Sequence, residues 1–323
     1  MRSRPQWSGR ESSRPASSDR TSIAAGRGLG GNREVPPLQL SALRGDLSAA
    51  RSEANLQEEG PRGKHGFPRA TKQPPKAAAE DGRNGKIPRA RRRRVLTHGI
   101  ELILFESADE VALAVAERLA RAARAGAHIA LTGGKTPEQA YREAARREPD
   151  WSNAELWWSD ERCVPPDDEL SNYHLAKRTL LDALDGAPKA VHRIRGELGK
   201  EAAADEYERE LGDTEFDLEL LGIGPDGHVA SLFPNAPTLQ EQKRVLPAEP
   251  GLEPFVDRVT LSLPALCSAH EIVFALAGAG KAEAARRAFA AEPGPQTPAS
   301  LVRARSGRTV AILDRAAAAK LRA

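Results

Sequence analysis

The arrangement of apolar and polar residues divides the chain into two parts. Residues 1–94 show no sustained apolar period and are rich in Ser, Pro, Gly and Arg. From about residue 100 onward, short apolar runs alternate with amphipathic helical stretches. A segment of the first kind cannot bury enough apolar surface to offset the entropy lost on ordering. We therefore predict a disordered extension over 1–94 and a single folded domain over 95–323.

Near-continuous apolar runs predict the strands of the folded domain, and such runs are typical of sheets covered on both faces. Helical stretches lie between most of them, and Ser107 with Glu110 predicts a capping box at the start of the first helix. Alternating strands and helices imply right-handed crossovers. The prediction is an α/β fold with a three-layer, mainly parallel, doubly wound sheet. The predicted strands are 101–105, 127–131, 154–158, 216–221, 259–263, 271–276 and 309–313.

Charge is distributed unevenly between the two parts. The chain's net charge is +3, but residues 1–94 carry 21 Lys/Arg against 9 Asp/Glu, which leaves 27 basic and 36 acidic residues for the remainder. The only aromatic residues of the extension are Trp7 and Phe67. Because bases of single-stranded nucleic acid stack on aromatic rings, we read the extension as a solvated tail and expect no nucleic acid partner. A targeting segment and a wrongly assigned start remain open alternatives.

Other composition features exclude several classes of protein. No apolar run reaches about 18 residues, and the N-terminus has no hydrophobic signal-peptide region. Two cysteines, Cys163 and Cys267, form neither a disulfide framework nor a metal motif. These features predict a soluble, cytoplasmic protein without a membrane partner or bound metal. The oligomeric state, monomer or homodimer, is left open.

The segment that follows the second predicted strand reads Thr-Gly-Gly-Lys-Thr-Pro, residues 132–137. Thr136 is predicted as the N-cap of a helix, with proline at its first position and Gln139 completing a capping box. Gly133 and Gly134 let backbone N–H groups approach an anion at the positive end of the helix dipole. The segment therefore predicts a phosphate-binding loop; a well-capped turn without a ligand is the alternative.

Charged residues follow the third predicted strand, where it emerges from the core. The order is Ser-Asp-Glu-Arg at 159–162, with Asn172 a short distance further on. Arg162 is a candidate for binding a phosphate or carboxylate, and Asp160 for orienting a hydroxyl or a histidine. A surface ion pair is the alternative interpretation.

Residues 222–227 have the spacing G-x-G-x-x-G, which is also found in dinucleotide-binding loops. That function is excluded here, because the preceding strand lies in the middle of the domain and prolines soon after the motif break the required helix. What the segment predicts instead is a tight turn that presents His228 at the start of a helix, with Asp226 beside it. An imidazole titrates near neutral pH, so a well-placed one can take a proton from water and return it to a leaving oxygen.

Taken together in order, these motifs resemble those of the 6-phosphogluconolactonases. The similarity extends over about residues 97–320, nearly all of the predicted domain, and no single motif is as specific as the ordered set. The resemblance rests on residues 131–137, 160–165 with 171–173, 222–234, 258–264, 278–282 and 298–302.

The resemblance implies a glucosamine-6-phosphate deaminase-like fold and the hydrolysis of 6-phosphogluconolactone to 6-phosphogluconate in the oxidative pentose phosphate pathway. It implies no metal and no nucleotide cofactor. His228 would be the general base that activates water, and Asp160 would orient that histidine or a sugar hydroxyl. The residues expected to bind the phosphate and the rest of the substrate are Gly133, Gly134, Thr136, Arg162, Asn172, Asp226, Arg258 and Lys281.

Some positions depart from the family pattern. Lys135 stands where a small residue is frequent, Val229 where threonine is frequent, and 253–257 lack the usual Pro- and Lys-rich sequence before Arg258. Two other functions are considered. A glucosamine-6-phosphate deaminase or isomerase has a similar loop but an additional carboxylate after the histidine, which this chain lacks. A non-catalytic sugar-phosphate sensor would keep the phosphate loop without needing His228.

Overall fold

The computed structural model describes residues 93–97 and 99–321. By contacts the chain divides into 1–76 and 77–323, and all described residues belong to the second unit. The predicted disordered extension ran to residue 94, but its last two residues, Arg93 and Arg94, pair with a neighbouring strand, so the boundary was placed too late. The rest of the extension lies outside the described residues, and its disorder stays a prediction. Among the described residues, none of the helices is long and apolar enough to cross a membrane.

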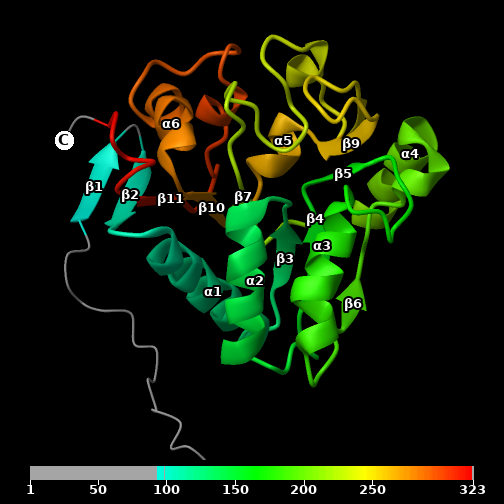
Figure 1. Ribbon diagram of the computed structural model, residues 1–323. Coiled ribbons are helices and arrows are strands. Elements are labelled where there is room, and N and C mark those ends of the chain that lie inside the picture. The colour runs from blue at the N-terminus through cyan, green and yellow to red at the C-terminus, as the bar shows by residue number, and fades with distance from the viewer. Residues whose placement is uncertain (1–92, 98, 322–323) are drawn as a thin grey trace, which may run out of the picture. The chain divides into compact units, whose positions relative to one another are not determined.

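The centre of the described part is an eight-stranded sheet, and most of its strands run parallel (Figure 1). Only β1, at one edge, pairs antiparallel with its neighbour β2. The predicted class of fold is therefore confirmed. In spatial order the strands are β1 (Arg93–Thr97), β2 (Ile100–Phe105), β11 (Arg308–Asp314), β10 (Glu271–Leu276), β7 (Leu218–Leu221), β3 (His128–Leu131), β4 (Glu155–Trp158) and β6 (Ala190–Val191).

Helices cover both faces of this sheet, as two adjacent tryptophans of β4 show. Successive side chains of a strand point to opposite faces. The ring of Trp158 packs edge-on against Tyr173, whereas that of Trp157 packs against Tyr207. Tyr173 and Tyr207 belong to different helices, which therefore lie on opposite faces. The α-helices are α1 (Ala108–Arg124), α2 (Lys135–Arg147), α3 (Asn172–Thr179), α4 (Lys200–Leu211), α5 (Leu263–Leu266) and α6 (Ala282–Phe289). The short 3₁₀ helices are η1 (Leu181–Ala183), η2 (Gly196–Leu198), η3 (Pro237–Gln240), η4 (Ala279–Lys281) and η5 (Pro298–Ser300).

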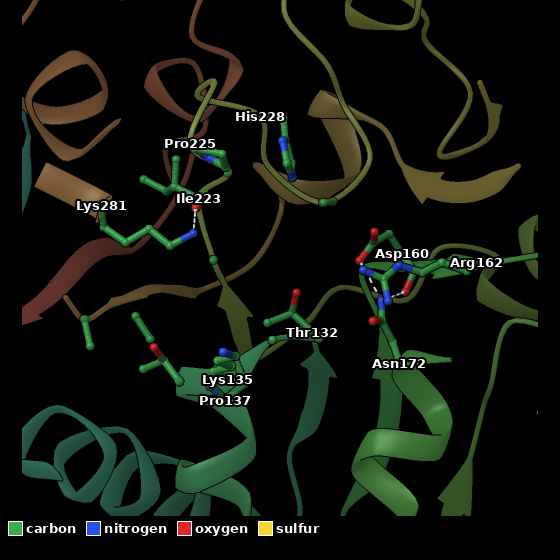
Figure 2. Close-up of a pocket in the computed structure, with 18 of the residues that line it drawn as sticks. Thr132, Lys135, Pro137, Asp160, Arg162, Asn172, Ile223, Pro225, His228 and Lys281 are labelled. Atoms are coloured by element: carbon green, nitrogen blue, oxygen red, sulfur yellow. Dashed lines mark hydrogen bonds between the residues drawn. The ribbon is translucent and has the colours of Figure 1, made fainter. Parts of the chain in front are cut away.

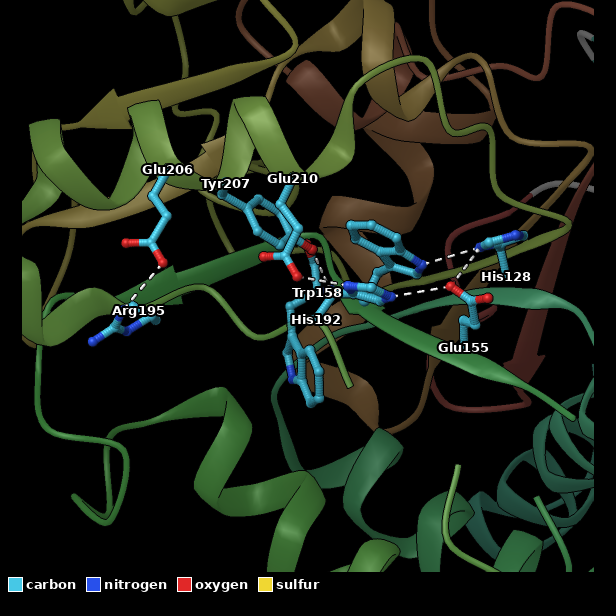
Figure 3. A network of polar contacts seen from close by, with 9 residues as sticks. His128, Glu155, Trp158, His192, Arg195, Glu206, Tyr207 and Glu210 are labelled. Atoms are coloured by element: carbon cyan, nitrogen blue, oxygen red, sulfur yellow. Dashed lines mark hydrogen bonds and ion pairs between the residues drawn. The ribbon is translucent and has the colours of Figure 1, made fainter. Parts of the chain in front are cut away.

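A polar network joins the beginnings of β3 and β4 to α4 (Figure 3). His192 Nε2 lies 3.0 Å from an oxygen of Glu155, and its Nδ1 lies 2.6 Å from an oxygen of Glu210. The imidazole stacks on Trp157 with 3.7 Å between ring centroids, and the indole N–H of Trp157 donates to His128 Nδ1. These contacts hold the amino ends of β3 and β4 in place. The predicted motifs follow the carboxyl ends of the strands, at the opposite edge of the sheet.

A second, three-stranded antiparallel sheet was not predicted. It has the order β5 (Asp160–Arg162), β9 (Arg258–Leu261) and β8 (Val245–Ala248). The apolar run 259–263 was predicted as a strand of the same kind as the parallel ones, but it belongs to this separate sheet. Its apolar residues are buried for a different reason, since the small sheet packs against α4. An apolar run reports burial and does not say which sheet a strand joins.

The four central strands explain where a ligand can bind. The neighbours β10, β7, β3 and β4 are parallel, so their carboxyl ends lie along one edge. After β3 the chain proceeds to β4 and β6, whereas after β7 it proceeds the other way, to β10 and β11. The adjacent strands β7 and β3 therefore form a topological switch point, where doubly wound sheets open a crevice at their carboxyl ends.

Candidate active site

A cleft of about 390 Å³ opens at this switch point (Figure 2). Loops from the ends of four neighbouring strands form it. Along the sheet edge, they carry Lys281 after β10, His228 after β7, the glycine pair after β3 and Asp160 after β4. Figure 2 shows Lys281 at one side of the cleft and Asp160, Arg162 and Asn172 together at the other.

The glycine loop after β3 is anchored from below by a buried tyrosine. Tyr141 of α2 donates from its hydroxyl to the carbonyl of Thr132 at 2.6 Å and accepts from the N–H of the same residue at 3.0 Å. Gly133 cannot carry a side chain, since its Cβ would lie 2.0 Å from Asn172 Oδ1. Gly134 has φ +113°, in the region that favours glycine. The loop is thus held rigidly at the start of α2.

The predicted cap of α2 is wrong. The helix begins at Lys135 with Gly134 as N-cap and without a side-chain cap, so Thr136 lies inside the first turn. Gln139 donates to Asp109 instead of completing a capping box. The first turn of a helix has N–H groups without partners inside the helix. Here those of residues 135 and 136 are therefore available to an anion in the cleft.

His228 lies in the tight loop that follows β7 and begins at residue 222. Asp226 Oδ1 accepts from the backbone N–H of His228 at 3.1 Å and lies 2.6 Å from its Nδ1. The N–H of Gly224 donates to the carbonyl of His228, and that of Gly227 donates to the carbonyl of Gly224. A Cβ on Gly224 would lie 2.0 Å from His228 Nδ1, so the imidazole rests directly on this glycine. The predicted helix start is wrong: a short irregular loop follows His228.

The environment of His228 is partly enclosed and contains two opposite charges. Its side chain is 22% exposed, and the ring packs against Phe233 at 5.0 Å between centroids. Burial opposes ionisation of Asp226, but the hydrogen bond and charge of His228 outweigh it and lower the pKa of Asp226. Lys281 donates from Nζ to the carbonyl of Ile223 at 2.6 Å. Burial lowers the pKa of Lys281, and the charge of Asp226 acts in the opposite direction.

Asp160 makes two other hydrogen bonds in place of one of its two predicted contacts, the one with His228, while the other, with a sugar hydroxyl, stays a prediction. Its Oδ1 accepts from Asn172 Nδ2 at 3.1 Å, and its Oδ2 accepts from Ser231 Oγ at 2.7 Å. Asp160 and Ser231 are both buried. The carboxylate that contacts His228 is therefore Asp226, while Asp160 connects α3 to the segment after His228.

A buried carboxylate next to Asp160 fixes the start of α3. Glu161 accepts from the backbone N–H groups of Asn172 and Tyr173 and from the hydroxyl of the N-cap residue Ser171. Burial raises the pKa of Glu161 to about 7, and these donors act against that rise. Because it holds the backbone of Asn172, Glu161 determines where the amide of Asn172 enters the cleft.

Two arginines face each other across the small sheet. Arg162 of β5 is directly opposite Arg258 of β9, and both line the cleft. Each has a buried Nε without a hydrogen-bond partner. Burial lowers the pKa of Arg258 and the charge of Arg162 adds to this, while the charges of Asp160 and Glu161 act in the opposite direction. Like charges directly opposite on paired strands destabilise the pairing, so this arrangement favours an anion between them.

The cleft collects nine of the ten residues singled out in the sequence. The tenth, Asp226, does not line the cleft but contacts His228. Sequence reasoning did not single out Ser231 and Phe233, although both lie inside the motif 222–234. Nothing in the sequence pattern shows that Ser231 bonds to Asp160 or that Phe233 packs against His228. Sequence reasoning also missed Tyr141, which reads as an ordinary core position of an amphipathic helix. Among the described residues, no group of three His, Cys, Asp or Glu side chains is placed to hold a metal ion.

Comparisons with known proteins show which proteins the chain is similar to. The family described as glucosamine-6-phosphate isomerases/6-phosphogluconolactonase matches residues 105–311. The 6-phosphogluconolactonase of Streptomyces coelicolor is 36% identical over 247 residues, covering 68% of this chain and 94% of that protein. The human 6-phosphogluconolactonase is 36% identical, covering 67% and 91%. The crystal structure of 6-phosphogluconolactonase from Thermotoga maritima is similar with a TM-score of 0.59 and 30% identity, covering 66% and 98%.

Proposed function

Since the chain belongs to the glucosamine-6-phosphate isomerase/6-phosphogluconolactonase family, we propose that it hydrolyses 6-phosphogluconolactone to 6-phosphogluconate, with His228 as the general base. This places it in the oxidative pentose phosphate pathway. The observation that carries the role of His228 is its position in the cleft, with Nδ1 held 2.6 Å from the carboxylate of Asp226.

The contact with Asp226 assigns the two ring nitrogens different roles. A carboxylate accepts a hydrogen bond, so Nδ1 carries the proton and Nε2 keeps its lone pair in neutral imidazole. Nε2 takes a proton from water as the water oxygen bonds to the lactone carbonyl carbon. When the bond from that carbon to the ring oxygen breaks, the imidazolium returns the proton to the ring oxygen. Asp226 stabilises the imidazolium in between.

We assign the anchoring of the phosphate to the rest of the cleft. Gly133, Gly134 and Thr136 offer backbone N–H groups at the start of α2, and Arg162, Arg258 and Lys281 supply positive charge. We assign the carboxylate of Asp160 and the amide of Asn172 to the sugar hydroxyls, because both side chains line the cleft. Binding energy from the phosphate then positions a neutral ester for attack.

The test is turnover of freshly generated lactone in a pH-stat assay, corrected for its spontaneous opening. His228→Ala is expected to lower kcat by about 10² to 10⁴-fold, the usual contribution of a general base. His174→Ala is a matched control, because that histidine is also 22% exposed but lies outside the cleft and pairs with Glu169. Unchanged turnover in His228→Ala would refute the assigned base.

Other properties expected from the sequence stay predictions. Release of ammonia from glucosamine 6-phosphate would instead support the deaminase. Against that function, the segment 229–234 after the histidine has no carboxylate, and its Ser231 donates a hydrogen bond to Asp160. A sugar-phosphate sensor would bind the lactone without turnover. A cytoplasmic location, the role of residues 1–94 and the choice between monomer and homodimer are to be determined by fractionation, truncation and sedimentation.

A further inference from the structure

One arginine outside the cleft holds the loop that carries His228. Arg287, on α6, donates from Nη1 to the carbonyl of Asp226 at 2.8 Å and from Nη2 to the carbonyl of Pro225 at 2.7 Å. It comes 61 residues after Asp226 in the sequence. Its side chain is partly buried, its Nε is buried without a partner, and it does not line the cleft.

The two hydrogen bonds fix the orientation of consecutive peptide groups. In a trans peptide the C=O and N–H point in opposite directions. The carbonyl of Asp226 points to Arg287, and the N–H of the same peptide, from Gly227, donates to the carbonyl of Gly224 at 3.0 Å. The loop is thus closed by its own hydrogen bonds on one side and by the guanidinium on the other.

The same peptide groups determine where the base and its partner lie. Asp226 supplies both the backbone turned toward Arg287 and the carboxylate that contacts His228 Nδ1. A rotation of this peptide would move the carboxylate and the imidazole together. Glycines on either side, Gly224 and Gly227, have little intrinsic resistance to such a rotation.

We infer that Arg287 is a positioning residue for the reaction, because its forked contact with the carbonyls of Pro225 and Asp226 keeps the His228–Asp226 pair in its reactive orientation. This inference rests on the proposed role of His228. A guanidinium suits this role, since its planar fork bonds two oxygens at once, whereas a lysine ammonium has no fixed direction.

The neighbouring residue provides a matched control. Arg286 lies on the same helix, carries the same charge and is exposed, and it pairs with Glu283 at 2.7 Å. Arg287→Ala is expected to lower kcat about 10- to 100-fold, the range for a base displaced by up to about 1 Å. KM should change by less than about threefold, because the proposed phosphate contacts are untouched. Arg286→Ala should stay within about twofold in both constants.

Further measurements separate positioning from a loss of folding. Thermal unfolding gives the folded fraction, so that kcat is compared per folded molecule. Guanidinium chloride is added at concentrations well below those that unfold the protein. We expect it to restore turnover in Arg287→Ala and to leave turnover in Arg286→Ala unchanged. The kcat of Arg287→Lys should lie between those of Arg287→Ala and the parent protein, while the kcat of Arg286→Lys should equal that of the parent. The two lysine variants provide the comparison if Arg287→Ala does not fold.

Two outcomes are decisive and distinguishable. Equal kcat per folded molecule in Arg287→Ala and Arg286→Ala, without rescue by guanidinium, would overturn the role of Arg287 alone. Full turnover in His228→Ala would overturn the proposed base, and the inference on Arg287 with it. A drop in kcat at nearly constant KM, reversed by guanidinium, supports the inference.

Discussion

Replacing Asp226 by Asn tests which carboxylate assists His228. The oxygen Oδ1 lies 2.6 Å from Nδ1, and the two side chains are 27% and 22% exposed. A hydrogen bond to a charged group contributes about 1.5–3 kcal/mol, and partial exposure screens the pair toward the lower end. Asparagine keeps an acceptor oxygen but loses the charge. We therefore expect kcat/KM to fall about 10- to 100-fold, since each 1.36 kcal/mol changes a rate about tenfold.

A substitution at the second carboxylate provides the control for this perturbation. Asp160→Asn is the control, because Asp160 bonds to Asn172 and Ser231. Its kcat/KM should fall less than that of Asp226→Asn, because the carboxylate of Asp160 bonds to residues other than His228.

The measurement is initial rate against lactone concentration for the parent and both variants, with the spontaneous hydrolysis of the lactone subtracted. A larger fall of kcat/KM in Asp160→Asn than in Asp226→Asn would refute the reasoning. It would mean that Asp160 acts on His228 during catalysis, which is one of the two roles predicted for it from the sequence, and that the loop rearranges when the lactone binds.

Two further substitutions probe the packing around the site. Gly224→Ala places a Cβ 2.0 Å from His228 Nδ1, so we expect kcat to fall about 10²-fold. Gly280→Ala is the control, because its Cβ meets nothing within 4 Å. Its kcat should be near that of the parent protein in the same assay. Glu161 has a pKa raised from 4.5 to about 7 by burial, so the folded state keeps a proton that the unfolded state has released. The free energy of unfolding should therefore fall by about 2 kcal/mol as pH rises from about 5 to 8, and Glu161→Gln should remove this dependence in urea titrations. An equal fall in the Gln variant would count against the buried carboxyl as its source.

The local sequence was sufficient for six of the eight strands of the main sheet, all but the two edge strands β1 and β6, and for the segments that end at the cleft. Parallel strands buried on both faces need near-continuous apolar runs, so they are visible without tertiary information. The run 271–276 was predicted with the bounds that the structure shows. Glycines were also informative, because the glycine pair after β3 and the loop of His228 both bring backbone close to other groups.

Short strands and polar contacts were beyond the reach of the sequence pattern. The strand β5 has only three residues, too few for a period, so the small antiparallel sheet was missed. The same omission hid the pairing of Arg162 with Arg258. The cap of α2 was misplaced because its chain enters through Gly134, whose positive φ lets the helix begin before Thr136.

The sequence by itself determined which segments follow the strands of the main sheet. From these segments it predicted a general base and an anion site at one edge of that sheet. Only the tertiary structure decided that Asp226, and not Asp160, contacts His228, and that Arg287 from a distant helix holds their loop. The physical reason is that hydrophobic periodicity and backbone conformation are encoded in neighbouring residues, whereas a hydrogen bond depends on orientation within a few tenths of an ångström. That orientation is set by packing. Packing brings Arg287 to a loop 61 residues away, and it decides the side-chain contact even between Asp226 and His228, which are two residues apart.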